Sequence, residues 1–131
     1  MEPVDRLRRI CLELPEAHEE PAWVGVRWRV RTKTFAHVID VDEDSPPSLA
    51  KVREVVALPA TIVTFRSAGL ELQALRDGGH PFCYVGFGRD AMAMALDDDT
   101  DWAEVRELLT ESYCLLAPKQ LAALVARPAA E

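Results

Sequence analysis

The 131-residue sequence contains little cysteine and no long apolar run. Cys11, Cys83 and Cys114 are odd in number and widely spaced, and none belongs to a C-x-x-C pair. This spacing argues against a disulfide framework and a zinc knuckle, so we expect buried, reduced thiols. No apolar stretch approaches the roughly 20 residues of a membrane span, and the charged N-terminus lacks a signal-peptide core. We therefore expect a cytoplasmic protein with no membrane partner.

The sequence also lacks the common catalytic motifs. It contains no G-x-S-x-G, no H-E-x-x-H and no G-x-x-x-x-G-K-[ST], which excludes the easily recognised hydrolases, metalloproteases and P-loop enzymes. Gly86-x-Gly88-x-x-Ala91 loosely matches the dinucleotide fingerprint, but a strand-like alternation of small and large residues follows it, where a helix would be required. We interpret the glycines as part of a hairpin connection.

Two further patterns indicate structure more than chemistry. Asp97, Asp99 and Asp101 alternate like the first ligands of a calcium loop, but Trp102 and Leu108 stand where glycine and glutamate are needed. These carboxylates are typical of a helix start. Among the possible catalytic side chains, His37, His80 and Cys83 are each predicted to be structural. The sequence therefore predicts no cofactor, no metal and no catalytic residue, hence a protein that is not an enzyme.

Charge supplies the one feature that suggests a function. With 15 Lys and Arg against 22 Asp and Glu, the net charge is −7, so nucleic-acid binding would require a local basic patch. Cations occur at every second residue of one segment, and a continuous strand would project them from one face. They are Arg27, Arg29, Arg31 and Lys33, and Arg66 is a further candidate for the same surface. Phosphate oxygens suit such a row, because each guanidinium offers a planar fork of donors. The alternative is a solvated face neutralised by Asp40, Asp42, Glu43 and Asp44.

Hydrophobic periodicity predicts the order of the elements. An amphipathic helix is expected over 4–14, an exposed polar connector over 15–21, two strands within 23–41 and a short helix capped by Ser48. A third strand follows at 60–65, then a helix ending at Gly78-Gly79, and a hairpin of 82–85 with 91–96. Asp101 and Glu104 form a capping box for a long helix, and a short helix follows Pro118.

The fold class that follows is α+β. Helices at both ends of a strand-rich middle indicate an antiparallel sheet in two layers, with helices packed on one face. The predicted order is helix, three strands, helix, two strands, helix, in a single domain spanning 1–131.

Several segments together resemble the MmcQ/YjbR family. They are R-R-I-C-L-E-L-P near the N-terminus, E-E-P-A-W, K-T-F-A at 33–36, Y-V-G at 84–86 and D-W-A-E-V-R-E-L-L-T-E-S-Y-C-L-L-A-P-K-Q-L at 101–121. The resemblance implies a double-wing, CyaY-like α+β domain, a bacterial type of protein and the family label of DNA-binding protein, without assigned catalytic residues. In family members Gly-Trp commonly follows Y-V-G, whereas this chain continues with Phe87-Gly88-Arg89. The stretch 43–59 is longer than usual, so we expect it to be an insertion.

Two functions fit these observations best, and an enzyme whose unfamiliar site gathers His37, His80 or Cys83 with carboxylates is a third. The first is a non-enzymatic binding module whose basic hairpin, formed by Arg27, Arg29, Arg31 and Lys33 with Arg66 nearby, contacts nucleic-acid backbone or another anionic partner. The second is a protein-interaction or small-ligand module that uses an apolar groove between helices and sheet. A monomer or a small homo-oligomer fits either function.

Overall fold

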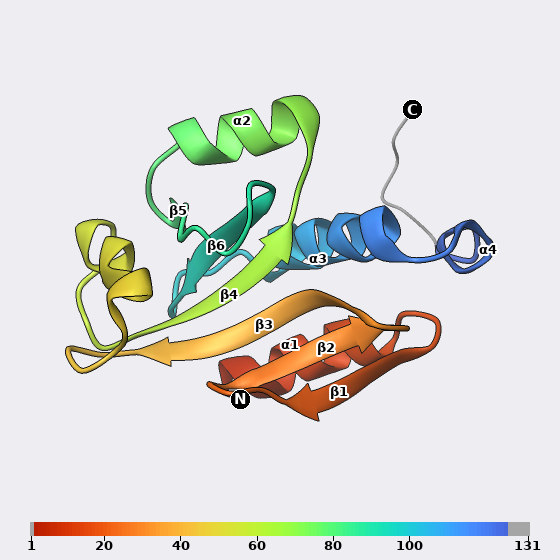
Figure 1. Cartoon of the computed structure of the whole chain (residues 1–131), viewed down its shortest axis with the longest axis horizontal. Coiled ribbons are helices and arrows are strands. Elements are labelled where there is room, and N and C mark those ends of the chain that lie inside the picture. Colours follow the sequence, from red (N-terminus) through yellow and green to blue (C-terminus); the bar gives the residue numbers. More distant parts are fainter. Residues whose placement is uncertain (1, 126–131) are drawn as a thin grey trace.

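The computed structural model describes residues 2–125, which form one antiparallel sheet with helices on both of its faces (Figure 1). The sheet has six strands in the order β1-β2-β3-β4-β6-β5. Their bounds are β1 (Ala17–Pro21), β2 (Val26–Val30), β3 (Lys33–Val41), β4 (Ala60–Arg66), β5 (Phe82–Cys83) and β6 (Ala91–Leu96). The predicted α+β class and antiparallel sheet are confirmed, but the helices are not confined to one face, because a short 3-10 helix over Pro47–Glu54 packs on the other.

The helices lie close to where periodicity predicts them. They are α1 (Pro3–Leu12), the 3-10 helix η1 (Pro47–Glu54), α2 (Gly69–Asp77), α3 (Trp102–Leu116) and α4 (Lys119–Ala122). The Asp101 side chain accepts hydrogen bonds from the backbone N–H groups of Ala103 and Glu104, which confirms the predicted cap of α3. The predicted Ser48 cap is wrong, because η1 begins at Pro47 without a side-chain cap.

The prediction of an exposed connector over 15–21 is also wrong. Residues 17–21 form β1, an edge strand paired antiparallel with β2 from Ala17–Val30 to Pro21–Val26. Its sequence, Ala-His-Glu-Glu-Pro, shows no apolar alternation because an edge strand can remain largely exposed. The strand therefore depends on its ladder to β2 and on ion pairs, which its own composition does not reveal.

Strand alternation divides the core between the two faces of the sheet. Trp28, Val38 and Val63 point toward α1 and α3, whereas Ile39 and Ile62 point to the opposite face. The larger core lies beneath α1, α2 and α3, and α1 contacts α3 directly. The smaller core lies beneath η1, which covers only part of the second face. We call this second face the outer face.

A serine from α3 joins the two central strands where their ladder ends. The last β3–β4 pair is Ala36 with Phe65, and the next in register would be Phe35 with Arg66. Instead, the Ser112 hydroxyl donates to the Phe35 carbonyl oxygen at 2.6 Å and accepts from the Arg66 N–H at 2.8 Å. The strands therefore separate at this end of the sheet, and a fully buried hydroxyl satisfies both backbone groups.

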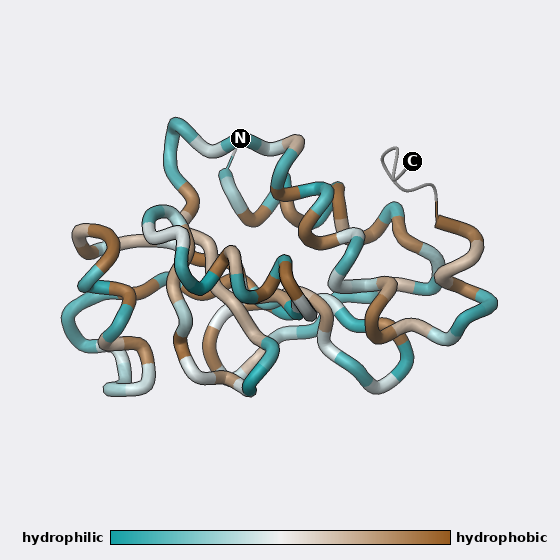
Figure 2. Tube along the Cα trace, turned by 90° about the horizontal axis from the view of Figure 1, so that it is seen from above, coloured by the Kyte–Doolittle hydropathy of each residue, from teal (hydrophilic) through white to brown (hydrophobic). Residues whose placement is uncertain are grey.

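Polar and apolar residues alternate in short stretches along the trace, as amphipathic elements require (Figure 2). Within residues 2–125, none of the helices combines the length and the apolarity that crossing a membrane demands.

Candidate anion-binding site

The outer face changes from apolar to basic along its strands. On β3 the outward residues pass from Ile39 to His37, and on β4 they pass from Ile62 through Thr64 to Arg66. The aliphatic half belongs to the core beneath η1. The other half lies at the end where Ser112 separates the strands, and it includes the side chains that the sequence singles out.

A cavity of about 330 Å³ occupies this uncovered half, which we call the basic half-face. Its lining includes Arg27, His37 and Arg66 together with Trp23 and Phe87, and it contains no carboxylate. Trp23 lies in the β1–β2 connection and is 99% exposed, and Phe87 is 37% exposed. A large, fully exposed aromatic side chain beside cations is an arrangement that binds planar anionic ligands.

Arg27 and Arg29 project from β2 on this face and share one carboxylate. The Arg27 guanidinium lies 3.0 Å from Glu20 Oε1, and that of Arg29 lies 3.3 Å from Glu20 Oε2. The hydrogen bond from Arg27, followed by that from Arg29, holds the pKa of Glu20 below its ordinary value. Two cations against one anion leave one positive charge in excess, and the buried Nε atoms of both arginines have no hydrogen-bond partner.

The four cations do not share one face, because the chain turns between β2 and β3 and does not form the continuous strand that would align them. Arg31 occupies the tight β2–β3 turn with a φ of 56°, and its guanidinium pairs with Glu16 at 3.0 Å. Lys33 lies opposite Val30, whose side chain is buried beneath the helices, so alternation places it on the opposite side from Arg27. The turn interrupts the row, and only Arg27 and Arg29 remain side by side.

The predicted counter-ions are also wrong. Asp40 accepts from the Thr61 hydroxyl, Asp42 accepts from the Asp44 backbone N–H, and Glu43 pairs with Arg53. Glu20 of β1 pairs with Arg27 and Arg29, Glu16 just before β1 pairs with Arg31, and Arg66 pairs with Asp90 at 2.6 Å. These partners cannot be assigned from the sequence when 15–21 is taken for a connector, because the strand β1 is what brings Glu20 beside the arginines.

The other polar candidates are separated from one another. His37 Nε2 lies 2.5 Å from the Val24 carbonyl oxygen, a contact that fixes the ring at the edge of the basic half-face. His80 lines a different cavity beside Asp97, and Cys83 is buried, which raises the pKa of its thiol to about 11. Within residues 2–125, no group of three or more His, Cys, Asp or Glu side chains is arranged to hold a metal ion.

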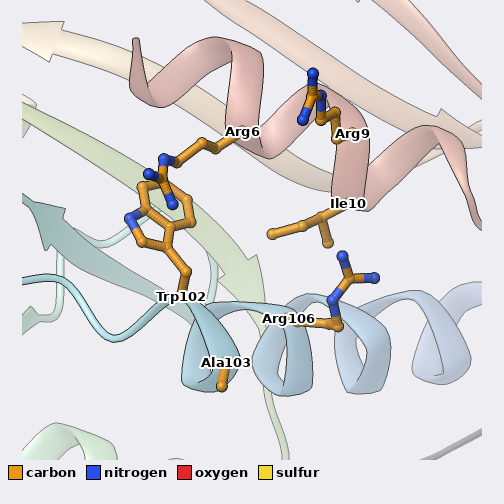
Figure 3. A pocket seen from close by; sticks show the side chains of 6 residues that line it. All are labelled: Arg6, Arg9, Ile10, Trp102, Ala103 and Arg106. Atoms are coloured by element: carbon orange, nitrogen blue, oxygen red, sulfur yellow. The ribbon is translucent and has the colours of Figure 1, made fainter. Parts of the chain in front are cut away.

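A second cationic cavity lies on the opposite side of the sheet, between α1 and α3 (Figure 3). It measures about 400 Å³, and its lining consists of Arg6, Arg9, Ile10, Trp102, Ala103 and Arg106. The position of these arginines around one cavity is not predictable from the sequence, because it depends on how two helices far apart in the chain pack together. The spacing of Arg6 and Arg9 by three residues, on one side of an amphipathic helix, is the only local signal.

Comparisons with known proteins agree with this architecture. A crystal structure of protein DR2400 from Deinococcus radiodurans, which carries a DUF419 domain, superposes with a TM-score of 0.64 at 20% identity. The match covers 98% of this chain and 91% of that one, and it supports the fold. No curated protein matches the sequence. The YjbR family model matches residues 12–115, which is most of the chain and extends from the end of α1 to the last turns of α3. The chain therefore belongs to the YjbR family.

Proposed function

We propose that this protein is a non-enzymatic binding module that holds a single nucleic-acid strand on the basic half-face. The observation that carries this proposal is the fully exposed Trp23 beside Arg27 and Arg66, over a cavity whose lining contains no carboxylate. Single strands are bound by cations that follow the backbone and by aromatic rings that stack on bases. Both components are present here within one open sheet surface.

The geometry favours the sheet surface over the hairpin tip. At the tip, Arg31 is paired with Glu16, so its charge is already balanced. On the basic half-face, Arg27 and Arg29 share Glu20 and retain one uncompensated charge. A phosphate can approach this excess charge at short range even though the net charge of the protein is −7. We therefore assign the contact to Arg27 and Arg29, while Arg66 lines the same cavity but is paired with Asp90.

Two observations support a binding function without catalysis. His37 and His80 line different cavities, so they do not cooperate as a proton donor and acceptor. The raised pKa of the buried Cys83 thiol keeps it protonated near neutral pH, which opposes a role as a nucleophile.

The alternative function, a small-ligand site between helices and sheet, has a corresponding cavity. It measures about 240 Å³ and lies between the start of α1 and the strands, where Val4, Val26 and Val38 contribute to its lining. This volume is below the range of about 300–1,000 Å³ that is usual for small-molecule pockets. The basic half-face is therefore the better supported site.

Fluorescence anisotropy with a labelled single-stranded oligonucleotide of about twelve nucleotides tests the proposal. We expect saturable binding at low salt, weakened about ten-fold or more in Arg27→Gln/Arg29→Gln and in Trp23→Ala, with affinity falling as salt rises. Arg53→Gln/Lys119→Gln removes the same charge from exposed positions on η1 and α4 and should bind like the wild type. Absence of binding at low salt, or equal binding by all variants, would disprove the proposal. Because Trp23 is fully exposed, Trp23→Ala remains informative if the arginine variant unfolds.

A further inference from the structure

We infer that the cavity between α1 and α3 is a binding site for a small phosphate monoester that carries a flat apolar group. This site is separate from the basic half-face, because α1 and α3 cover the other face of the sheet. Its ligand differs as well, since the cavity is suited to one compact dianion and not to a polymer strand.

The charge of the cavity argues for an anion. Arg6 and Arg9 come from α1 and Arg106 comes from α3, and all three residues line the cavity. Arg6 lies over Trp102 and Arg106 points from α3 toward Ile10, whereas Arg9 points away from α3 (Figure 3). Like charges gathered in this way repel one another. The protein has more carboxylates than cations, and these carboxylates could have separated the arginines. None of the six lining residues is acidic. The cluster therefore lacks the counter-charge that an ordinary surface would supply.

Two of the three arginines are without a carboxylate partner in the described part of the chain. Among the ion pairs within residues 2–125, neither Arg6 nor Arg9 has a carboxylate partner. Arg106 lies 3.3 Å from Glu13, but both side chains are more than half exposed, so this pair contributes little and a phosphate can compete with it. Three cations opposed by one exposed carboxylate leave about two positive charges. A phosphate monoester carries about −1.5 to −2 at neutral pH, which matches this excess.

The apolar surface defines the rest of the ligand. The Arg6 guanidinium carbon lies 5.2 Å from the centroid of the Trp102 ring, a cation–π contact that holds the positive charge at the cavity. Ile10 is 5% exposed and forms an apolar part of the wall. A volume of about 400 Å³ exceeds what inorganic phosphate needs and falls within the usual range for small molecules. A planar apolar group can therefore lie against Trp102 and Ile10 while its phosphate contacts the arginines.

Titration of the full chain with phenyl phosphate, followed by isothermal titration calorimetry and tryptophan fluorescence, tests this inference. We expect saturable binding, about ten-fold or more weaker for inorganic phosphate, and no saturable binding of phenol at the same concentrations. In Arg6→Gln/Arg9→Gln the affinity should fall about ten-fold or more. In Trp102→Phe the fluorescence change should disappear, while calorimetry still detects binding through the arginines.

Arg53→Gln/Lys119→Gln is the matched control, since it removes two exposed positive charges outside the cavity. Equal affinity of the wild type and Arg6→Gln/Arg9→Gln would overturn the inference, as would failure of phenyl phosphate to bind the wild type. Because Arg6 and Arg9 are exposed, these substitutions should leave the thermal transition in place, which a melting curve checks. Oligonucleotide binding by Arg6→Gln/Arg9→Gln reports separately on the basic half-face, so failure of one site is distinguishable from failure of the other.

Discussion

The indole N–H of Trp28 donates to Glu19 Oε1 at 2.9 Å, and this bond joins the most deeply buried tryptophan to the edge strand. Glu19 also accepts from Arg8 of α1, at 2.7 Å and 3.1 Å. One carboxylate on β1 therefore satisfies a buried donor on β2 and a guanidinium on the helix above them. This arrangement attaches a polar edge strand to the core.

Glu19 should make the stability of the protein depend on pH in the acid range. Hydrogen bonding from Arg8, followed by that from Trp28, holds the pKa of Glu19 below its ordinary value of 4.5, against the opposing effect of burial. A lowered folded-state pKa means that the stabilisation is complete above the unfolded value and is lost as pH falls through the folded value. We expect Glu19→Gln to cost about 1.5 kcal/mol at pH 7 and to flatten the pH dependence below about pH 4.5. Urea unfolding at several pH values measures both effects.

Glu43→Gln is the control for this prediction, because the Glu43–Arg53 pair is largely exposed. Its free energy of unfolding should stay within about 0.5 kcal/mol of the wild type at pH 7. If the stability of Glu19→Gln falls with decreasing pH as steeply as that of the wild type, the role assigned to Glu19 is contradicted.

Ser112→Ala should destabilise the protein by about 1–3 kcal/mol, because it leaves the Phe35 carbonyl oxygen and the Arg66 N–H without their shared partner. Chemical denaturation measures the loss. Ser48→Ala, at an exposed position without a cap, should change the stability by less than about 0.5 kcal/mol. Equal effects of the two substitutions would show that the hydroxyl between the strands contributes nothing.

The sequence predicts elements that bury apolar faces and misses those that do not. The stripe of α3 appears in hydropathy at a period of 3.6, and β6 shows a period of 2 in side-chain size, because burial selects residues on each face. β1 shows no such periodicity, since its Glu19 and Glu20 are held by ion pairs with other elements. Once β1 is missed, the counter-ions of Arg27 and Arg29 cannot be assigned, and their row appears more positive than it is.

Glu20→Gln should strengthen oligonucleotide binding about three-fold or more, if the basic half-face is the contact surface. The substitution removes the one carboxylate that Arg27 and Arg29 share, so both guanidinium groups become available to phosphate. Glu16→Gln makes the same charge change at the hairpin tip, where it frees Arg31 alone. Anisotropy titrations at fixed salt compare the two variants. A larger gain from Glu16→Gln would relocate the contact to the tip.

The three thiols should differ in reactivity toward a disulfide reagent at pH 8. Burial raises the pKa of Cys83 from 9.0 to about 11, which lowers its thiolate fraction about 100-fold, and burial also raises the pKa of Cys11. Cys114 is only half-buried, so it should react first in the native protein. The absorbance of the thiolate released from the reagent gives the reaction rates. Cys114→Ser should abolish the early phase of the reaction. Persistence of that phase in Cys114→Ser would contradict this order.

All six residues of β6 are buried, yet its two faces differ in volume: Met92, Met94 and Leu96 point to the helices, and Ala91, Ala93 and Ala95 point to the outer face. Polarity therefore cannot distinguish the two sides of this strand, but side-chain size does. The long residues belong to the larger core beneath the helices, while the alanines belong to the smaller core, together with Leu49 and Val52 of η1. A larger side chain at Ala93, which is fully buried, would need space that the core beneath η1 already fills. The alanines of β6 therefore allow this core to pack closely on the outer face.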